Sequence, residues 1–499
     1  SSDVAFADAF LKGVDNFDVR AAYEAALRNA TVAPPAAAVG RKGLRRSIFL
    51  RYTPKATESG LSWTLEGCVN DFGIANLAEA LGDHENAEYF RDRALSYVHS
   101  FDPVTGFFQG RRANGGWRWP ANQYDPRAWG GDYVETNGWN TAFSVPHDGM
   151  GLAGLLGGRK ALGAKLDEFF ATPETGRSRG KYWRPIHEMA EARDVRMGQY
   201  GHSNQPSHHI IFMYAYAGAM WRTQEKVREV LARLYVGSEI GQGYYGDEDN
   251  GEMSAWWLFG ALGFYPLRVG SPEYVIGSPL FRKATVRLAG GAELVVNAPN
   301  NSPTNVYVQG LRVNGTSYDK AYLPHELIAK GAVLDFQMGP QPSNWACGPD
   351  ALPPSLTPLD TLPRTMVDIT GDPAGHGEGS DGLNVAALFD DDSRGQVSFR
   401  TPTAWVGYRT AGAGATVRFY TLTSGTGRDD PRSWTLRGST DGASWVVLDE
   451  RVRETFPWRR QTRAFSVANP GHYTHYRLDI TENTGTPTVT LAQLELLAR

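Results

Sequence analysis

The first part of the chain carries apolar residues at the spacing of amphipathic helices. Within residues 222–235, Val227, Val230, Leu231 and Leu234 recur at positions i, i+3, i+4 and i+7 of an otherwise charged stretch, which predicts a surface helix with one buried face. Similar patterns, separated by loops rich in Gly, Pro and Trp, predict helices over residues 17–31, 64–82, 84–100, 149–171, 206–221 and 252–263. Many helices with long loops on one side favour a toroid of paired helices around a central cleft.

The pattern changes after about residue 271. Residues 272–347 alternate apolar and polar positions between Gly and Asn turns, which predicts short antiparallel strands. The Pro-rich residues 348–365 predict a stiff linker. Residues 366–499 alternate again between tight turns, so we expect a separate β-sandwich of the jelly-roll type. The expected fold class is multidomain α+β, beginning with a helical domain over residues 1–271.

Composition limits the class of protein. The chain has 499 residues, 41% hydrophobic and 21% charged, which is enough for two or more cores, and its formal net charge is -4. Lys and Arg are scattered, which disfavours a nucleic-acid partner. The longest nearly apolar run, residues 209–221, is too short to span a membrane, and the first residues lack the features of a signal peptide, so any such signal has been removed. Cys68 and Cys347 leave a disulfide and two free thiols equally open.

Two polar turns carry the candidate chemistry. In GHSNQPSHH, residues 201–209, an Asn, a Gln and several His precede an apolar stretch. In GDEDNGEMSAWW, residues 246–257, Asp247 and Asp249 lie among glycines. A polar turn joined to a buried helix commonly holds reactive side chains at the mouth of a pocket. Taken alone, the acidic turn is more often a solvated loop or a simple cation site.

These segments and VETNGWNTAFSVPHD, residues 134–148, resemble glycoside hydrolase family 92, the calcium-dependent exo-acting α-mannosidases that invert the anomeric centre. The resemblance covers about residues 1–345 and implies that the helical domain is an (α/α)6-type catalytic toroid. ALFDDDSRG, SWTLRGSTDGASW and LAQLELL make the last region similar to the F5/8 type C, discoidin-like sandwich used as a family 32 carbohydrate-binding module. The implied activity is removal of terminal mannose from mannan or high-mannose N-glycans.

The resemblance also implies catalytic roles. An inverting glycosidase needs a protonated acid and a carboxylate that activates water, ~6.5–9.5 Å apart. Glu135 is the expected acid, and Asp247 and Asp249 are the expected base pair, with both side chains on one side of an extended turn. The alternative is that Glu135 pairs with an arginine such as Arg127. Nearby aromatic rings would raise the pKa of Glu135 by desolvation; they are Trp129, Tyr133 and Trp139.

Gln205 departs from the family pattern, which commonly reads Asn-Glu-Pro-Ser-His-His at this point. Because an amide does not titrate, Gln205 cannot donate a proton as an acid. If the family Glu takes part in proton donation, this chain needs a leaving group that is stable as an anion, such as the phosphate of a mannosyl-phospho-6-mannose cap. The alternatives are that Gln205 only hydrogen-bonds sugar hydroxyls, or that the chain is a catalytically silent glycan-binding protein.

Calcium would bind the sugar O2 and O3 hydroxyls together with hard oxygen ligands, for which Asn204 and Asp249 are the candidates. Zinc is disfavoured, because His202, His208 and His209 suit sugar contacts and core hydrogen bonds better. The candidate substrate-binding residues comprise a His-Glu pair expected at the leaving-sugar subsite and four residues of the first turn: His187, Glu188, Asn204, Gln205, His208 and His209.

In the last region, Asp390, Asp391 and Asp392 predict a second calcium site or, equally well, a solvated acidic turn. Aromatic residues there are candidates for stacking on a sugar, although the two on predicted strands, Trp434 and Trp445, also suit a core. The stacking candidates are Trp405, Tyr408, Trp445 and Trp458.

Family members carry an N-terminal β-sandwich before the helical domain, and Ser1 stands where that domain would begin. We therefore expect a β-sandwich from the same precursor to complete the sugar pocket. Mannose-containing glycans are the expected partners, and a secreted or extracellular location suits them. An unrelated toroid-shaped lyase or phosphorylase is the remaining alternative.

Overall fold

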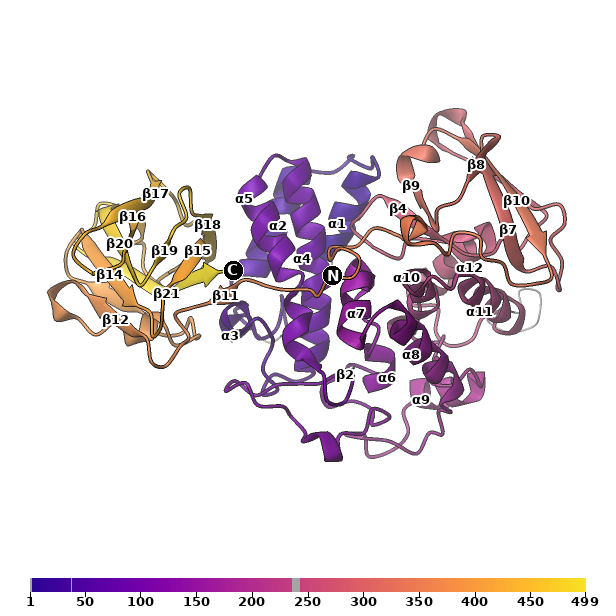
Figure 1. Ribbon diagram of the computed structural model, residues 1–499, viewed down its shortest axis with the longest axis horizontal. Coiled ribbons are helices and arrows are strands. Elements are labelled where there is room, and N and C mark those ends of the chain that lie inside the picture. Colours follow the sequence, from indigo (N-terminus) through magenta and orange to yellow (C-terminus); the bar gives the residue numbers. More distant parts are fainter. Residues whose placement is uncertain (1, 37, 236–242) are drawn as a thin grey trace.

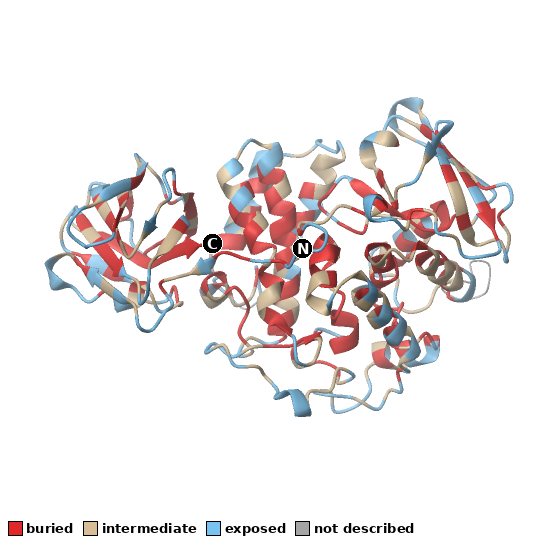
Figure 2. Cartoon of the chain, viewed as in Figure 1, coloured by how far each residue is buried: buried red, intermediate tan, exposed pale blue. Residues whose placement is uncertain are grey.

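The computed structural model describes residues 2–36, 38–235 and 243–499. Figure 1 shows a central group of helices, a strand-rich region at one end and the C-terminal strands at the other end. Figure 2 shows that buried residues concentrate inside each of these three regions. The helices therefore lie between two β-rich ends.

A long helix is the centre of the helical group. α4 (Gly60–Ala80) packs against α1 (Ser2–Leu11), α2 (Val19–Thr31) and α5 (His84–Arg93). The other helices of the described ranges are α3 (Leu44–Leu50), α6 (Gly138–Thr141), α7 (Gly149–Leu156), α8 (Arg159–Ala171), α9 (His187–Val195), α10 (Tyr214–Ala217), α11 (Met220–Arg233) and α12 (Glu252–Leu262).

The periodicity read from the sequence is confirmed in α11, which buries Val227, Val230 and Leu231. Glycines interrupt two other predicted helices. The helix predicted over residues 149–171 is divided into α7 and α8, because Gly157 and Gly158 have left-handed backbone conformations, with φ 101° and 114°.

The single helix predicted over residues 206–221 is wrong. The chain there forms two short 3-10 turns, Gln205–Ser207 and Ile210–Met213, and then α10. α10 ends at Gly218, whose φ of 70° closes the helix. The apolar side chains at this point are nevertheless fully buried, so the sequence pattern reports burial rather than helix length.

The strands that follow the helices form two sheets. A three-stranded sheet has the order β3 (Phe264–Tyr265), β4 (Glu273–Ile276) and β9 (Tyr322–Pro324). A five-stranded sheet has the order β5 (Lys283–Arg287), β6 (Glu293–Asn297), β10 (Ala332–Gly339), β7 (Tyr307–Val313) and β8 (Thr316–Tyr318). A separate pair, β1 (Phe101–Asp102) and β2 (Phe107–Phe108), lies among the loops of the helical region.

The prediction that all these strands are antiparallel is wrong for one pair. β6 and β10 run parallel, with Ala332 opposite Leu294. The chain passes through β7, β8 and β9 between them, and a connection of that length allows a parallel pair.

The Pro-rich segment 348–365 is anchored to the helical region. The fully buried carboxylate of Asp148 accepts hydrogen bonds from Ser355 Oγ at 2.5 Å, from Thr357 N at 2.7 Å and from Thr357 Oγ1 at 2.6 Å. Tyr97 OH donates to the same carboxylate at 2.7 Å. This segment therefore lies against the helices at this point, although its composition predicts only a stiff linker.

The C-terminal strands form two sheets around one core. One sheet has the order β11 (Val367–Asp368), β21 (Val489–Ala498), β15 (Ala415–Ser424) and β18 (Thr462–Ser466), with β13 (Val397–Phe399) paired to β21 and β19 (His472–Tyr473) paired to β15. The other has the order β12 (His376–Gly379), β14 (Ala404–Arg409), β20 (His475–Asn483), β16 (Pro431–Ser439) and β17 (Val446–Arg451). Trp434, Tyr420 and Phe465 belong to the shared core, so Trp434 has the core position that its strand pattern allowed.

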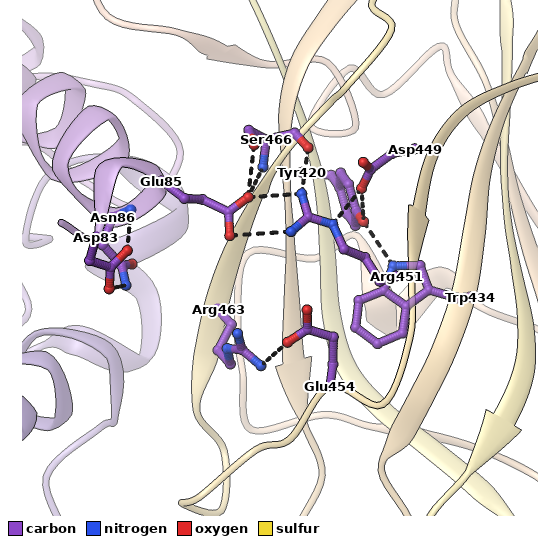
Figure 3. A network of polar contacts seen from close by, with 10 residues as sticks. All are labelled: Asp83, Glu85, Asn86, Tyr420, Trp434, Asp449, Arg451, Glu454, Arg463 and Ser466. Carbon is purple, nitrogen blue, oxygen red and sulfur yellow. Dashed lines mark hydrogen bonds and ion pairs between the residues drawn. The ribbon is translucent and has the colours of Figure 1, made fainter.

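The C-terminal strands pack directly on α5. Tyr89 of α5 stacks on Phe419 of β15 with ring centroids 6.4 Å apart, within an apolar cluster that also includes residues of β18 and β21. Figure 3 shows Glu85 of α5 in an ion pair with Arg451 of β17, with N and O 2.8 Å apart, while Ser466 of β18 donates two hydrogen bonds to the same carboxylate. The C-terminal region is thus fixed to the helices by apolar and polar contacts.

Among the residues that the structure describes, each helix is too short or too polar to cross a membrane. Cys68 is buried, Cys347 is half-buried, and both are free thiols, so the disulfide alternative is wrong.

Candidate active site

The turn of residues 201–209 and the segment that carries Glu135 line one cavity of about 470 Å³, and the acidic turn reaches it through Glu252 rather than through Asp247 or Asp249. This volume lies within the range of ~300–1,000 Å³ that is usual for small-molecule sites. α4 and residues 265–269 supply apolar wall, including Trp63, Val69 and Leu267. The predicted site residues that line the cavity are Glu135, Asn204, Gln205, His208 and His209.

Asn204 and Gln205 link the two acidic loops. Asn204 Nδ2 donates to the backbone oxygen of Glu135 at 3.0 Å, and Asn204 Oδ1 accepts from the backbone N–H of Gln205 at 3.1 Å. Gln205 Nε2 donates a hydrogen bond to Asp249 Oδ2. Glu135 and Asp249 therefore contact neighbouring residues of the same turn.

Glu135 and Asp249 share an unusual backbone conformation. Both are non-glycine residues with positive φ, 50° and 53°. Left-handed conformations of such residues cost about 1–3 kcal/mol and are found most often at functional sites. The packing of the two loops must hold this backbone conformation.

The extended turn predicted for Asp247 and Asp249 is wrong. Gly246, Asp249, Asn250 and Gly251 all have positive φ, so the chain reverses tightly and the alternation of side chains in extended backbone does not apply. Asp249 contacts Gln205. The pKa of the His187 imidazole is raised, against the effect of burial, by its contact with Glu191 and the charge of Glu188, and Asp247 adds a smaller contribution.

The desolvation predicted for Glu135 is also wrong. Glu135 is exposed to solvent, whereas the aromatic rings near it in sequence are buried and directed to other partners. Tyr133 OH donates to Phe108 O at 3.0 Å, and Trp129 Nε1 donates to Glu174 at 3.0 Å. Trp139 packs edge-on against Phe107, with ring centroids 4.8 Å apart.

The alternative in which Glu135 forms an ion pair with Arg127 is also wrong. Arg127, proposed as its partner, binds Asp125 at 3.0 Å.

His187 and Glu188 begin α9 and lie near Glu135. His187 Nε2 is 3.1 Å from Glu188 Oε1. Burial raises the pKa of the Glu188 carboxyl, and the negative charge of Glu135 raises it further, against the opposing effects of its own backbone N–H and of His187. Glu188 and Glu135 are therefore two carboxyl groups in different environments, one half-buried and one exposed.

The histidines of the first turn have separate hydrogen-bond partners. His208 Nδ1 is 2.7 Å from Glu252 Oε1, and its Nε2 is 2.8 Å from the backbone oxygen of His202. His209 Nε2 is 2.8 Å from the backbone oxygen of Phe143. Burial lowers the pKa of His209 to about 4.

His202 lies inside the core between the hydroxyls of Tyr200 and Tyr235, each 2.8 Å away. In the part of the chain that the structure describes, no group of three or more His, Cys, Asp or Glu has the arrangement of a metal site. The position of His202 agrees with the core hydrogen bonds expected for it.

Glu252 is a cavity residue that the sequence reasoning did not single out. It lines the cavity, pairs with His208 and begins α12 three residues after Asp249. The sequence feature that could have drawn attention to Glu252 is its position at the start of an apolar helix, where an acidic side chain is favoured.

The oxygens beside Gln205 have the chemistry that calcium requires. Asn204 contributes an amide oxygen and Asp249 a carboxylate, both of which are hard ligands. The Asn204 side-chain oxygen already accepts a hydrogen bond from the backbone N–H of Gln205, and the Asp249 carboxylate accepts one from the Gln205 side chain. Oxygens of both kinds can accept further bonds. These residues fit a calcium ion only as part of a ligand set that sugar hydroxyls or water complete.

The acidic turn of the C-terminal region is solvated in part, since Asp390 is exposed whereas Asp392 is not. Asp392 is buried and forms ion pairs with Arg45 at 3.0 Å and with Arg46 at 3.1 Å. Gln493 Nε2 donates to Ala387 O at 2.8 Å, to Asp390 Oδ1 at 2.7 Å and to Asp392 O at 3.2 Å. An amide donor thus binds the oxygens of the turn in the place where a cation was predicted.

The predicted sugar-stacking residues have different environments. Tyr408 is buried in the core, so the prediction that it stacks on a sugar is wrong. Trp405 and Trp445 are partly exposed and flank the guanidinium of Arg477, at 5.8 Å and 4.7 Å from their ring centroids. Trp458 lies 6.0 Å from the guanidinium of Arg28, next to the helical region.

Comparison with known proteins gives a consistent result. A model of the "Glycosyl hydrolase family 92 catalytic domain" matches residues 1–340. The solved family GH92 inverting mannosidase BT2199 from Bacteroides thetaiotaomicron is 37% identical, with a TM-score of 0.63, over 71% of this chain and 48% of its own. The family GH92 α-mannosidase BT3965 from the same organism is 34% identical, with a TM-score of 0.63, over 73% of this chain and 45% of its own.

A curated relative from Arthroderma benhamiae, described as an "Uncharacterized secreted glycosidase", is 28% identical over 395 residues, which are 71% of this chain and 47% of the relative. The chain spans about half the length of these relatives.

Proposed function

The chain belongs to glycosyl hydrolase family 92, and we propose that it is an exo-acting, inverting α-mannosidase that removes terminal mannose from mannan or high-mannose N-glycans. One observation carries this proposal: Glu135, Asn204 and Gln205 line a single cavity, and Asp249 is hydrogen-bonded to Gln205 at that cavity. Two carboxylates from separate loops beside a sugar-sized cavity are what glycoside hydrolysis needs.

In the proposed mechanism, Glu135 protonates the leaving oxygen. Its exposure to solvent lets it recover a proton from water after each turnover. Asp249 takes the proton from the attacking water, and Gln205 fixes the Asp249 carboxylate through its amide hydrogen bond. Asp247 assists at the same loop. His187 and Glu188, at the start of α9, contact the leaving sugar.

Asn204 and Asp249 would hold a calcium ion. A bound calcium would supply hard-cation binding of sugar hydroxyls and would favour a distorted ring. Asn204 also fixes the Glu135 loop through its hydrogen bond to the Glu135 backbone oxygen, so the same side chain positions acid and ring. His208 and His209 line the cavity wall as contacts for the sugar.

A second candidate substrate is a mannosyl-phospho-6-mannose cap. One observation favours this substrate. The amide of Gln205 donates a hydrogen bond to Asp249, and the family commonly has a glutamate at position 205. A phosphate leaves as an anion and needs no strong acid. The proposal for phosphodiesters therefore depends on Gln205, whereas the proposal for ordinary mannosides depends on Glu135.

We extend the proposal to the whole molecule. The helices belong to an (α/α)6-type toroid of residues 1–271, residues 272–347 complete the catalytic part, and residues 366–499 are a β-sandwich that binds carbohydrate as an F5/8 type C module. The protein acts outside the cell, as the name of its relative from Arthroderma benhamiae supports.

The test is mannose release from a synthetic aryl α-mannoside and from α-1,2-mannobiose, with calcium and after chelation. We expect release that chelation abolishes and that added calcium restores. Glu135→Gln should lower kcat by about 10²- to 10⁴-fold, the usual value of a general acid. A chain that binds mannose but releases none from any of these substrates or from the phosphodiester is the silent glycan-binding protein instead.

A further inference from the structure

The five-stranded sheet carries a cavity that the proposed function does not use. This cavity measures about 1030 Å³, close to the upper limit of the range of ~300–1,000 Å³ that is usual for small-molecule sites. Figure 1 shows β7, β8 and β10 of the sheet at the end of the molecule away from the C-terminal strands. Among the described residues, its lining shares no member with the lining of the candidate active site. The sheet therefore presents a separate candidate binding site.

One row of polar side chains crosses all five strands of this sheet. The register places Lys283 of β5 opposite Asn297 of β6, and Asn297 opposite Asp335 of β10. It also places Asp335 opposite Arg312 of β7, and Arg312 opposite Ser317 of β8. Residues opposite one another in neighbouring strands face the same side of a sheet. All five residues line the cavity, so the row runs across it.

The polar row faces away from the core. On β10, Leu334 and Phe336 are buried, whereas Asp335 between them is only half-buried. On β7, Arg312 is exposed between two buried neighbours. The apolar side chains of these strands belong to the main core, which leaves the polar side of the sheet available to a ligand.

The row has unused hydrogen-bonding capacity of both kinds. Asp335 Oδ1 accepts a hydrogen bond from Asn297 Nδ2 at 2.8 Å, and a carboxylate can accept further bonds at both of its oxygens. Arg312 Nη1 donates to Gly315 O at 3.0 Å, and a guanidinium has further N–H donors. Lys283, exposed at one end of the row, adds an ammonium group. Acceptors and donors therefore alternate along the cavity.

Two aromatic side chains border the cavity beside β8. Tyr318 and Trp345 both line it and are both partly exposed. Trp345 Nε1 donates to Tyr318 O at 3.0 Å, and Tyr318 OH donates to Tyr322 O at 2.7 Å. Because the polar atoms of both rings are bonded to the backbone, the rings are held in position and offer the cavity apolar surface.

We propose that this cavity is a second, non-catalytic glycan-binding site, which takes a neutral oligosaccharide. The charges favour a neutral ligand, because Asp335 would repel an anion and the two cations of the row, Lys283 and Arg312, would repel a cation. A sugar hydroxyl can donate to the carboxylate and accept from the guanidinium. The apolar C–H face of a pyranose ring packs well on an aromatic ring. The site would hold a glycan on the catalytic part of the chain independently of turnover.

The experiment measures binding to soluble mannan by affinity electrophoresis, as the ratio of mobilities with and without mannan in the gel. All proteins carry Glu135→Gln, so that hydrolysis is suppressed and a lack of mannosidase activity in the wild type does not affect the result. Arg312→Ala and Asp335→Ala should each weaken binding by about tenfold, as expected for the loss of a charged hydrogen bond. The matched controls are Arg287→Ala and Glu293→Ala, at exposed positions opposite each other on β5 and β6 and outside the cavity. Both should bind mannan as the Glu135→Gln parent does.

Binding of mannan by the C-terminal strands is common to all these proteins, so differences between them report on the cavity. Arg312→Ala keeps the test decisive if Asp335→Ala, which leaves the Asn297 amide without its partner, fails to fold. An unchanged mobility ratio in Arg312→Ala overturns the proposal and leaves the cavity to a protein partner. Equal weakening in Arg312→Ala and Arg287→Ala also overturns it, since the effect would then come from general surface charge. Stronger retardation by dextran sulfate than by mannan, lost in Arg312→Ala, overturns it too, because it identifies an anion site.

Discussion

Gln205 and Asp249 are joined by a side-chain hydrogen bond in which the Gln205 amide donates to the Asp249 carboxylate. This bond connects the turn that lines the cavity with the acidic loop. An amide at this position binds the carboxylate without competing with it for a proton. A glutamate there would place two carboxyl groups in contact, and one of them would have to hold a proton. The identity of residue 205 therefore decides whether the site contains a second proton donor.

Gln205→Glu should change the preferred leaving group. The new carboxyl faces Asp249, so it holds a proton at neutral pH and becomes available as an acid for a sugar leaving group. We expect the ratio of kcat/KM for α-1,2-mannobiose to that for a mannosyl phosphodiester to rise by about tenfold or more. Gln337→Glu, at an exposed position of β10, is the control for the added charge. An unchanged ratio in Gln205→Glu would remove the argument for a phosphate leaving group.

The sequence predicts which polar turns meet, because the motif residues Glu135, Asn204 and Gln205 all reach one cavity. It does not predict how the turns are shaped. The positive φ of Glu135 and Asp249 depends on contacts between loops that are distant in the chain, and a local pattern carries no information about those contacts. For the same reason the alternation argument failed for Asp247 and Asp249.

Apolar periodicity predicts burial well and element boundaries less well. α11 follows its pattern, whereas Gly218 ends α10 inside an equally apolar stretch. The parallel pairing of β6 and β10 is set by the path of the intervening chain. The anchoring of the Pro-rich segment depends on one buried carboxylate, Asp148, and an isolated aspartate in a sequence does not reveal its partners.

Glu85→Ala should loosen the contact between α5 and the C-terminal strands. Glu85 is paired with Arg451 and accepts two hydrogen bonds from Ser466, as Figure 3 shows. Their loss should lower the free energy of unfolding by about 1–2 kcal/mol, because the pair is largely shielded from solvent. Urea unfolding measures the difference. Glu88→Ala, at an exposed position of the same helix, should change stability by less than ~0.5 kcal/mol. Equal effects of the two substitutions would show that the interface contact contributes nothing.

Glu495 should make stability fall as pH rises. Burial, and then the charge of Asp368, raise the pKa of the Glu495 carboxyl from its ordinary 4.5 to about 8. Between these two values the folded protein keeps a proton that the unfolded chain has lost. The stabilising effect is therefore complete below about pH 4.5 and is lost as pH rises to about 8.

Glu495→Gln tests this dependence, because its amide oxygen can still accept the hydrogen bond from Thr421 Oγ1, 2.6 Å in the native protein, and does not titrate. The variant should be more stable than wild type at pH 8 by an amount on the order of a few kcal/mol, with a smaller difference at pH 5. Glu450→Gln, exposed on β17, should follow the wild-type curve. Parallel curves for Glu495→Gln and wild type would contradict the protonated state of Glu495.

Gln493→Glu should create a dependence on calcium that the native chain lacks at this turn. The Gln493 amide nitrogen donates to three oxygens, from Ala387, Asp390 and Asp392. Hard oxygens gathered around one donor are also what a calcium ion binds. The glutamate keeps the shape of the side chain but turns its donor into a fourth oxygen, which repels the others and should lower stability by about 2–4 kcal/mol without a cation. Millimolar calcium should restore the melting temperature of the variant and leave that of wild type unchanged. Gln341→Glu, at an exposed position, controls for the added charge. A loss of stability that calcium does not reverse would show that the amide has a purely local structural role and does not stand in for a cation.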